Sequence, residues 1–204
     1  MKRILAATAL LATMQAGATP ITGTGPGGPA VPGTTATFDF NSQPIAAFST
    51  LTIGDLTLSG IGGNLRSNSQ FAGSYNATGA RLIDNNGGGT HGFRFDFAHP
   101  LSAFALNFGA SDVNWTLSAY TASGTLLESL VIAPTHSVNN GSYFGLAGAN
   151  IGYATLTAAS SDYVVMDNFT MAAQVAAVPE PASLAMLGMG VAGLLAVRRR
   201  QRPS

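Results

Sequence analysis

Hydrophobic and polar positions alternate along most of the chain from residue 38 onward, in short runs that are bounded by clusters of Gly, Asn, Asp and Ser. In Phe93-Arg94-Phe95-Asp96-Phe97 the aromatic side chains share one face and the charged ones the other, which is typical of a half-buried β-strand. The same reasoning predicts strands over the following ranges: Thr37–Asn41, Ile45–Ile53, Leu56–Ser59, Ala80–Ile83, Gly92–Phe97, Ser102–Phe108, Asn114–Tyr120, Leu126–Ile132, Ser142–Phe144, Ile151–Thr157 and Tyr163–Met171.

Turn-forming residues separate these runs. Thr121-Ala122-Ser123-Gly124 lies between two alternating segments and predicts a hairpin turn, and the Asn- and Gly-rich segment 84–89 predicts a longer loop that tolerates positive φ. Helical periodicity is confined to the two ends of the chain. We therefore expect an all-β domain over residues 38–173, an antiparallel β-sandwich or jelly roll.

The segment before this domain, residues 19–37, consists almost entirely of Gly, Pro, Thr and Ala. Such a composition buries little apolar surface and does not offset the entropy lost on ordering. We expect a flexible leader here.

Residues 1–18 have the features of a secretory signal peptide. Lys2 and Arg3 precede the apolar run Ile4–Met14, and the small residues of Ala16-Gly17-Ala18 suit a signal peptidase that cleaves after Ala18. The alternative is a short, buried first helix, which the uniformly apolar run disfavours.

The C-terminal end combines three features in a fixed order. Pro179, Glu180 and Pro181 are followed by sixteen uncharged residues, Ala182–Val197, and then by an arginine cluster that includes Arg198, Arg199 and Arg200. A helix over 182–197 would be about 24 Å long, enough for a single transmembrane helix if the arginines snorkel and the bilayer thins locally. The positive end is expected to stay in the cytoplasm.

This tail, residues 178–202, resembles the PEP-CTERM sorting signal of Gram-negative bacteria; the alternative is an ordinary anchor with a chance Pro-Glu-Pro. The resemblance implies recognition of Pro179-Glu180-Pro181 by an exosortase-like membrane transpeptidase. It also implies a transient inner-membrane anchor, a cell-surface or extracellular destination, and a setting in exopolysaccharide or biofilm. Segments between Gly92 and Met171, such as GFRFDF and WTLSAYTASGTLLES, resemble the β-sandwich bodies that are fused to such tails.

Charge and cysteine content exclude several classes of function. Six of the nine positive residues lie in the two ends, so the body from Thr19 to Ala177 has three arginines against eight carboxylates and a formal charge of −5. An acidic body has no basic surface for nucleic-acid phosphates. The absence of cysteine excludes disulfides, thiolate metal sites and a cysteine nucleophile.

Catalytic motifs are equally sparse. His91, His99 and His136 share no metal-binding spacing, the body has no lysine, and no G-x-S-x-G elbow occurs. Glycosidases use two carboxylates, yet Glu128 is the only glutamate of the body and no spacing marks an aspartate pair. We expect a non-enzymatic protein without a cofactor; a secreted hydrolase with an unmarked carboxylate site is a secondary alternative.

Two binding hypotheses remain. Asp39, near the first strand, and Asp167, in the last, would meet if these strands are neighbours, and could hold a structural calcium ion; the alternative is that both simply face outward. Exposed aromatics at Trp115, Tyr75, Tyr143 and Tyr153 would suit a carbohydrate-binding module; the alternative is that Trp115 lies in the core and the tyrosines at strand ends. The main expectation is an exported matrix or surface protein, and glycan binding is its alternative.

Overall fold

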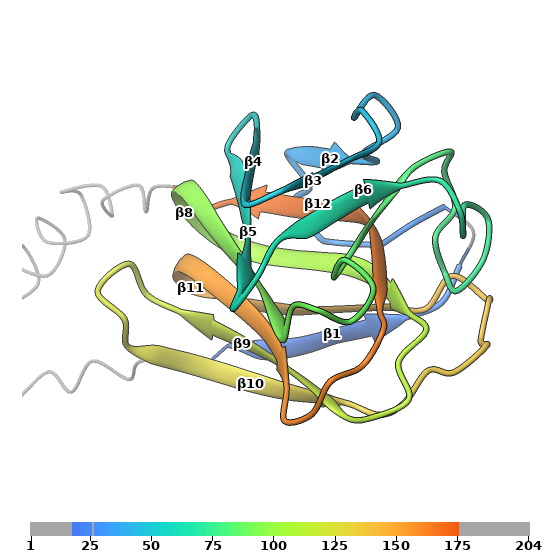
Figure 1. The fold of residues 1–204 in the computed structure, drawn as a ribbon. Helices are drawn as coiled ribbons and strands as arrows, with labels where there is room; N and C mark the ends of the chain where they lie inside the picture. The colour runs from blue at the N-terminus through green and yellow to red at the C-terminus, as the bar shows by residue number, and fades with distance from the viewer. Residues whose placement is uncertain (1–17, 26, 176–204) are drawn as a thin grey trace, which may run out of the picture. The chain divides into compact units, whose positions relative to one another are not determined.

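Two long strands in the middle of the chain form the frame of the fold in the computed structural model, which describes residues 18–25 and 27–175 (Figure 1). Every strand pairing in this part of the chain is antiparallel, and the described residues contain no helix. The prediction of an all-β, antiparallel fold is therefore confirmed. The strands are β1 (Thr19–Gly23), β2 (Ala36–Phe38), β3 (Ala46–Phe48), β4 (Thr50–Ile53), β5 (Leu56–Ile61), β6 (Leu65–Asn68), β7 (Leu82–Asp84), β8 (Gly92–Gly109), β9 (Trp115–Tyr120), β10 (Leu126–Ile132), β11 (Tyr143–Ala158) and β12 (Val165–Ala173).

The strands join into one twelve-stranded sheet with the order β10-β9-β11-β8-β12-β7-β6-β3. Off this path, β1 pairs with β11, β2 with β12, β5 with β8, and β4 with β5. The hairpin between β9 and β10 turns at the predicted place, where the N–H of Thr121 donates to the carbonyl of Thr125 at 2.9 Å.

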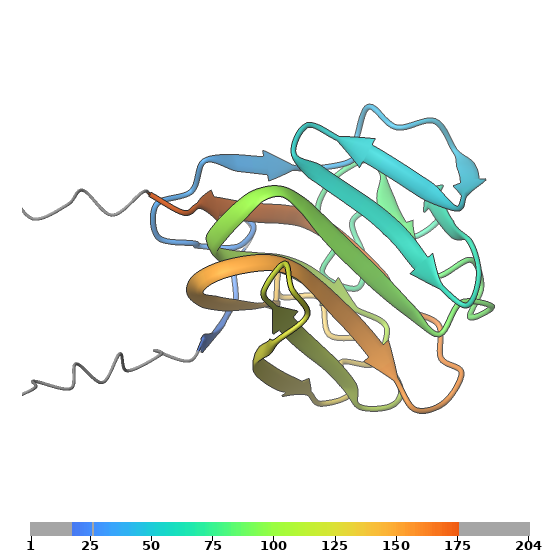
Figure 2. The same cartoon turned by 90° about the vertical axis from the view of Figure 1, so that its left-hand side faces the viewer.

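Strands β8 and β11 each take part in two halves of the sheet. The first half of β8, residues 92–97, pairs with β5, whereas residues 101–109 pair with β12. The register against β11 shifts between these halves, next to the exposed residues 98–100, which include a proline without a donor N–H. Each was predicted as two short strands, but each is one long, bent strand, and the bends let the sheet curve over itself (Figure 2).

Aromatic side chains from both halves fill the space inside this curve. Phe95 stacks on Phe169 with ring centroids 5.1 Å apart, and Phe97 meets Phe104 at 5.6 Å. The predicted alternation in segment 93–97 is confirmed, since its phenylalanines are buried while its two charged residues remain partly exposed. Burial of each large side chain contributes about 1.5–3 kcal/mol, which makes this cluster the main source of stability.

The expected flexible leader, residues 19–37, requires a correction. Its first five residues are β1, which pairs with residues 143–147 of β11, and β2 at its end pairs with β12. The composition of this segment does not predict its strands, because a strand that adds to a sheet edge depends on backbone hydrogen bonds and needs few buried side chains. Ile21 supplies one partly buried side chain, which packs, as Tyr143 does, against a small apolar cluster made of Val31, Ala103, Ala105 and Ala172. Strand β6 was also missed, because its sequence Leu-Arg-Ser-Asn has no apolar alternation.

The start of β1 and the end of β12 lie at the same end of the sheet. Thr19 pairs with Ala147 of β11. Ala147 pairs in turn with Ala103 of β8, which pairs with Ala172 of β12. Three inter-strand spacings correspond to about 14 Å. At the opposite end of β12, Val165 pairs with Gly109, the last residue of β8, and the loops beyond them form that end of the domain.

Several predicted features lie outside the described residues: the signal peptide before Ala18, the Pro179-Glu180-Pro181 motif, the transmembrane helix 182–197, and Arg198, Arg199 and Arg200. Among the residues that are described, no helix has the length and apolar character needed to cross a membrane.

Candidate functional site

Four loops surround a pocket at the end of the domain opposite to Thr19 and Ala173. Its volume is 390 Å³, and we call it the loop pocket. Its lining residues combine aromatic rings with a carboxylate, an imidazole and a hydroxyl: Phe71, Tyr75, Ala110, Asp112, His136, Ser137 and Tyr163. These residues come from the segments before β7, after β8, after β10 and before β12.

The buried amide of Asn76 fixes the first loop. Its Oδ1 accepts hydrogen bonds from three successive N–H groups, those of residues 140–142, each at 3.1 Å. Its Nδ2 donates to the carbonyl of Phe108 at 2.9 Å. A buried amide with all of these partners stabilises one loop conformation, since leaving any of them unpaired would cost about 1–3 kcal/mol. Tyr75 is thereby placed in the pocket wall.

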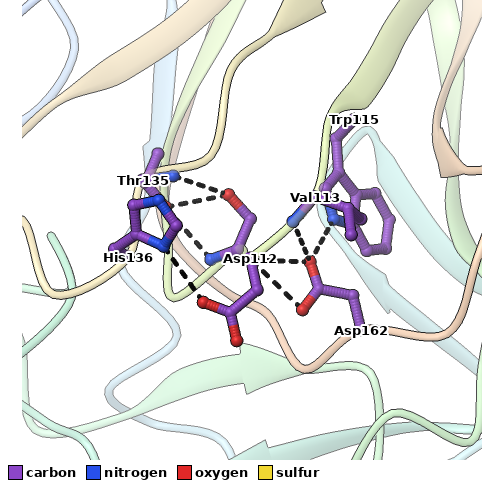
Figure 3. A network of polar contacts seen from close by, with 7 residues as sticks. Asp112, Val113, Trp115, Thr135, His136 and Asp162 are labelled. Atoms are coloured by element: carbon purple, nitrogen blue, oxygen red, sulfur yellow. Dashed lines mark hydrogen bonds and ion pairs between the residues drawn. The ribbon is translucent and has the colours of Figure 1, made fainter.

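Asp162 ties the second loop to the fourth (Figure 3). Its Oδ2 accepts hydrogen bonds from the backbone N–H of Asp112 at 3.1 Å and from Nε1 of Trp115 at 2.9 Å. The indole ring itself is buried in the core and tilts against Phe93 and Phe108. The pocket rim is therefore connected through Trp115 to the rigid aromatic core.

Ser111 and Thr135 join the second and third loops. The hydroxyl oxygens lie 3.0 Å apart, and each hydroxyl also accepts the other residue's backbone N–H. The next residue in each loop reaches into the pocket, so Nδ1 of His136 lies 3.1 Å from Oδ1 of Asp112 (Figure 3). These two side chains are 65% and 78% exposed and remain available to a ligand.

Tyr163 forms the fourth wall of the pocket, and a hydrogen bond to a buried carboxylate fixes its hydroxyl. Its hydroxyl donates to Oδ2 of the buried Asp84 at 3.3 Å, and the same oxygen accepts from Arg66 and Asn68. Burial, followed by the charge of Asp84, raises the pKa of Tyr163, so the phenol stays neutral. The hydrogen bond to Asp84 likewise raises the pKa of Arg66.

The backbone at the pocket adopts conformations that L-residues rarely occupy. Tyr75, Ala110 and His136 have φ values of 53°, 67° and 45°, in the left-handed region. Each such residue costs of order 1 kcal/mol and persists only where its surroundings fix it. Three of the lining residues are held in this way, so the contacts around the pocket fix the conformation of its loops.

The rings of the loop pocket meet as walls. Phe71 contacts Tyr75 and Tyr163 edge to face, at interplanar angles of 74° and 62° and with centroids 5.5 Å apart in both pairs. Aromatic rings that meet at steep angles are better suited to one compact ligand group than a flat stacking surface is. Asp112 is the one carboxylate among the lining residues, whereas glycoside hydrolysis uses two.

The sequence identified part of this site. Of the four aromatics proposed for a sugar platform, Tyr75 lines the pocket, whereas Trp115 is only 1% exposed and lies in the core, as its alternative interpretation held. Tyr143 packs over Gly23 of β1. Phe71, Asp112 and Tyr163 were missed, because single residues in separate loops leave no periodic signal.

Tyr153 belongs to a column on the outer face of the sheet. One face of its ring stacks on Tyr120, with centroids 4.7 Å apart, and the guanidinium of Arg94 lies 4.0 Å from the ring centroid. Arg94 is in turn paired with Asp96. These neighbours occupy the ring faces that a sugar would need, so Tyr153 is not a stacking platform.

The geometry around Asp39 and Asp167 does not favour calcium binding. Asp167 is buried and accepts hydrogen bonds from the N–H groups of Thr78, Gly79 and Asn168. Asp39 is exposed and accepts from Asn41, although it lies near enough for its charge to add to the raised pKa of Asp167. N–H donors occupy the oxygens that a cation would need, and no cluster of three acidic or histidine residues suited to a metal occurs in the described part of the chain.

The remaining chemical candidates lie apart from the pocket. His91 and His99 are exposed at the two ends of the first half of β8. Glu128 lies on β10 and accepts a hydrogen bond from the N–H of Ser129. None of them lines the loop pocket; of the three histidines, His136 does.

Comparison with known proteins identifies the tail. The PEP-CTERM protein-sorting motif matches residues 177–200, so the chain carries this signal. No curated protein matches the chain. Among solved structures, a DUF4465 family protein from Bacteroides caccae has 10% identity and a TM-score of 0.37, covering 84% of this chain and 99% of its own. TmCBM61, solved in complex with β-1,4-galactotriose, has 9% identity and a TM-score of 0.33, covering 59% and 90%.

Proposed function

We propose that this protein is a non-enzymatic component of the cell surface or extracellular matrix, delivered across the inner membrane and sorted through its C-terminal tail. The PEP-CTERM motif at residues 177–200 carries the proposal, because it indicates an exported Gram-negative protein with a transient membrane anchor. Signal peptidase would act after Ala18, and an exosortase-like transpeptidase at the tail. The proposed setting is exopolysaccharide or biofilm.

The fold supports this order of events. The described fold starts at β1 and ends with β12, so cleavage after Ala18 and processing near Pro179 would both leave all twelve strands in place. The two ends of the domain also lie on one side, and the loop pocket on the other. An anchored domain would then have its pocket at the end farther from its point of attachment.

The sorting proposal is tested by intact-mass analysis of the exported protein from cells with and without the exosortase-type enzyme. The expected mature chain begins at Thr19 and lacks Arg198, Arg199 and Arg200 when the enzyme is present. A surface protein that retains Arg200 in enzyme-containing cells would contradict the proposal.

Glycan binding is the second candidate function, and the loop pocket favours it. Aromatic walls with a few convergent polar groups are typical of small-molecule sites, and a pyranose ring offers both C–H faces and hydroxyls to such a surface. The body would then act as a carbohydrate-binding module that attaches the protein to matrix polysaccharide.

A pull-down of the exported protein on polysaccharide from its own matrix tests this candidate. Phe71→Ala should reduce retention by about tenfold, since it removes the ring that contacts both other aromatics. Tyr153→Ala, on the outer face of the sheet, is the matched control and should bind normally. Equal losses in both variants would argue against the pocket.

A further inference from the structure

The charges around the loop pocket define the chemical class of its ligand more narrowly than its shape does. Asp112 is the one carboxylate of the lining, and its side chain is 78% exposed. No arginine lines the pocket: Arg66 lies behind Tyr163 and is paired with Asp84, and Arg94 is paired with Asp96 on the outer face. The lining thus has one carboxylate and no arginine or lysine, and its histidine, His136, contacts that carboxylate.

Aromatic walls next to a carboxylate are suited to a positively charged nitrogen. The faces of Phe and Tyr rings attract cations, and this attraction strengthens when the cation is partly desolvated. The ring of Phe71 meets those of Tyr75 and Tyr163 at steep angles, so the rings form walls rather than a flat platform. An ammonium group between such walls would contact ring faces and lie near Asp112 at the same time.

The net charge of the whole domain also favours a positively charged ligand. Residues 19–177 have three arginines and eight carboxylates. A formal charge of −5 attracts polycations and repels polyanions over several ångströms, and this effect raises the association rate most at low ionic strength. Uronate-rich or sulfated polysaccharides are therefore disfavoured as ligands.

We propose that the loop pocket binds the protonated amino group of a de-N-acetylated amino sugar within a polysaccharide. This inference rests on the proposed glycan-binding role and adds the chemical class of the glycan. Asp112 neutralises the ammonium, the three rings enclose it and the adjoining pyranose ring, and Ser137 offers a hydroxyl to the sugar. His136 positions Asp112 through the 3.1 Å contact between Nδ1 and Oδ1.

The test is calorimetric titration of the processed, exported protein with four probes: a glucosamine hexasaccharide, its fully N-acetylated form, a glucose hexasaccharide, and ethanolamine. The glucosamine oligomer should bind at least about tenfold more tightly than each of the others. Ethanolamine distinguishes an amino sugar from any small amine, because it lacks the pyranose ring.

Two aspartate variants locate the interaction. Asp112→Asn should weaken binding of the glucosamine oligomer by about tenfold and leave the N-acetylated oligomer unchanged. Asp55→Asn removes the same charge from an exposed turn between β4 and β5 and should change neither affinity. Both positions are exposed, so both variants are expected to fold.

The outcomes separate this inference from the proposed function. Equal affinity for the glucosamine, N-acetylated and glucose oligomers would overturn the amino-sugar inference and leave glycan binding intact. Equal weakening by Asp112→Asn and Asp55→Asn would reduce the interaction to general charge attraction and would also overturn it. Absence of binding to every glycan would contradict the glycan-binding function itself.

Discussion

Buried polar residues hold the loops of this domain to its sheet, and Asp167 is the most unusual of them. It lies in β12 next to Asn168, where the pairing with β8 shifts register and φ of Asn168 is 47°. Burial raises the pKa of Asp167 to about 6, although hydrogen bonds from Asn168, Gly79 and Thr78 act in the opposite direction. The bulge thus keeps a carboxylate that titrates closer to neutrality than an exposed aspartate does.

This shift predicts a pH dependence of stability. An unfolded aspartate has a pKa of about 3.9, so between about pH 4 and 6 the folded protein retains a proton that the unfolded chain has released. The contribution of Asp167 to the free energy of unfolding therefore falls as pH rises through this window, by up to about 3 kcal/mol, and is constant above it.

Urea denaturation of the wild type and of Asp167→Asn at several pH values measures this effect. Between about pH 4 and 6, the free energy of unfolding of the wild type should fall relative to that of Asp167→Asn as the pH rises. Curves that stay parallel across the window would show that Asp167 does not titrate there.

Asp162 gives a second prediction at the residue scale. Asp162→Asn replaces the carboxylate oxygen that accepts from two backbone N–H groups and from Nε1 of Trp115 by a weaker amide oxygen, and it places an NH2 group beside the N–H of Asp112, which now also contacts Oδ1 at 3.3 Å. We expect a loss of about 1–3 kcal/mol in the free energy of unfolding and weaker ligand binding at the loop pocket. Asp55→Asn is the control with the same chemical change at an exposed turn, and thermal denaturation of both variants compares them.

At the scale of the element, β1 is the strand that the sequence least suggests. It adds to the edge of β11 through five paired residues, and its side chains are exposed or only partly buried. Ile21 packs on the small apolar cluster, whereas Thr22 is exposed. Adjacent residues of a strand point to opposite faces, so the two positions distinguish strand docking from a general effect of added charge.

Ile21→Asp should release β1 from β11, and Thr22→Asp should not. The expected cost for Ile21 is about 1–2 kcal/mol, because its side chain is only partly buried. Hydrogen exchange of the backbone amides in residues 143–147 is the measurement, with faster exchange in the Ile21 variant alone. Identical exchange in both variants would show that backbone pairing holds β1 without its side chain.

At the scale of the whole molecule, the domain has its two chain ends on one side and its loop pocket on the other. The compact unit extends to Gln174, whose N–H donates to the carbonyl of Pro100 and whose Oε1 accepts from the N–H of Asn150. Phe169, in the last strand, stacks on Phe95 and Phe104 in the core. The fold thus needs the chain up to this point and has its last strand contact just before the sorting tail.

Two truncations test this boundary. An exported chain that ends at residue 177 should unfold at the same temperature as the processed protein. A chain that ends at residue 168 lacks Phe169 and most of the pairing between β12 and β8, and should not fold. Circular dichroism melting compares them, and a cooperative transition in the shorter chain would contradict the assigned role of β12.

The sequence alone determined the features that are written in consecutive residues. Pro179-Glu180-Pro181 followed by an apolar run and arginines is a linear signal, and the comparison with known families confirms it. Alternation in segment 93–97 likewise predicted its buried face, because the two faces of a strand repeat every second residue. Only the tertiary structure decided the rest. The loop pocket joins Phe71, Asp112, His136 and Tyr163 because the registers of β8 and β12 bring four separate loops to one end, and β1 is a strand because β11 has an open edge beside it. Neither arrangement leaves a local pattern, since pairing partners lie far apart along the chain.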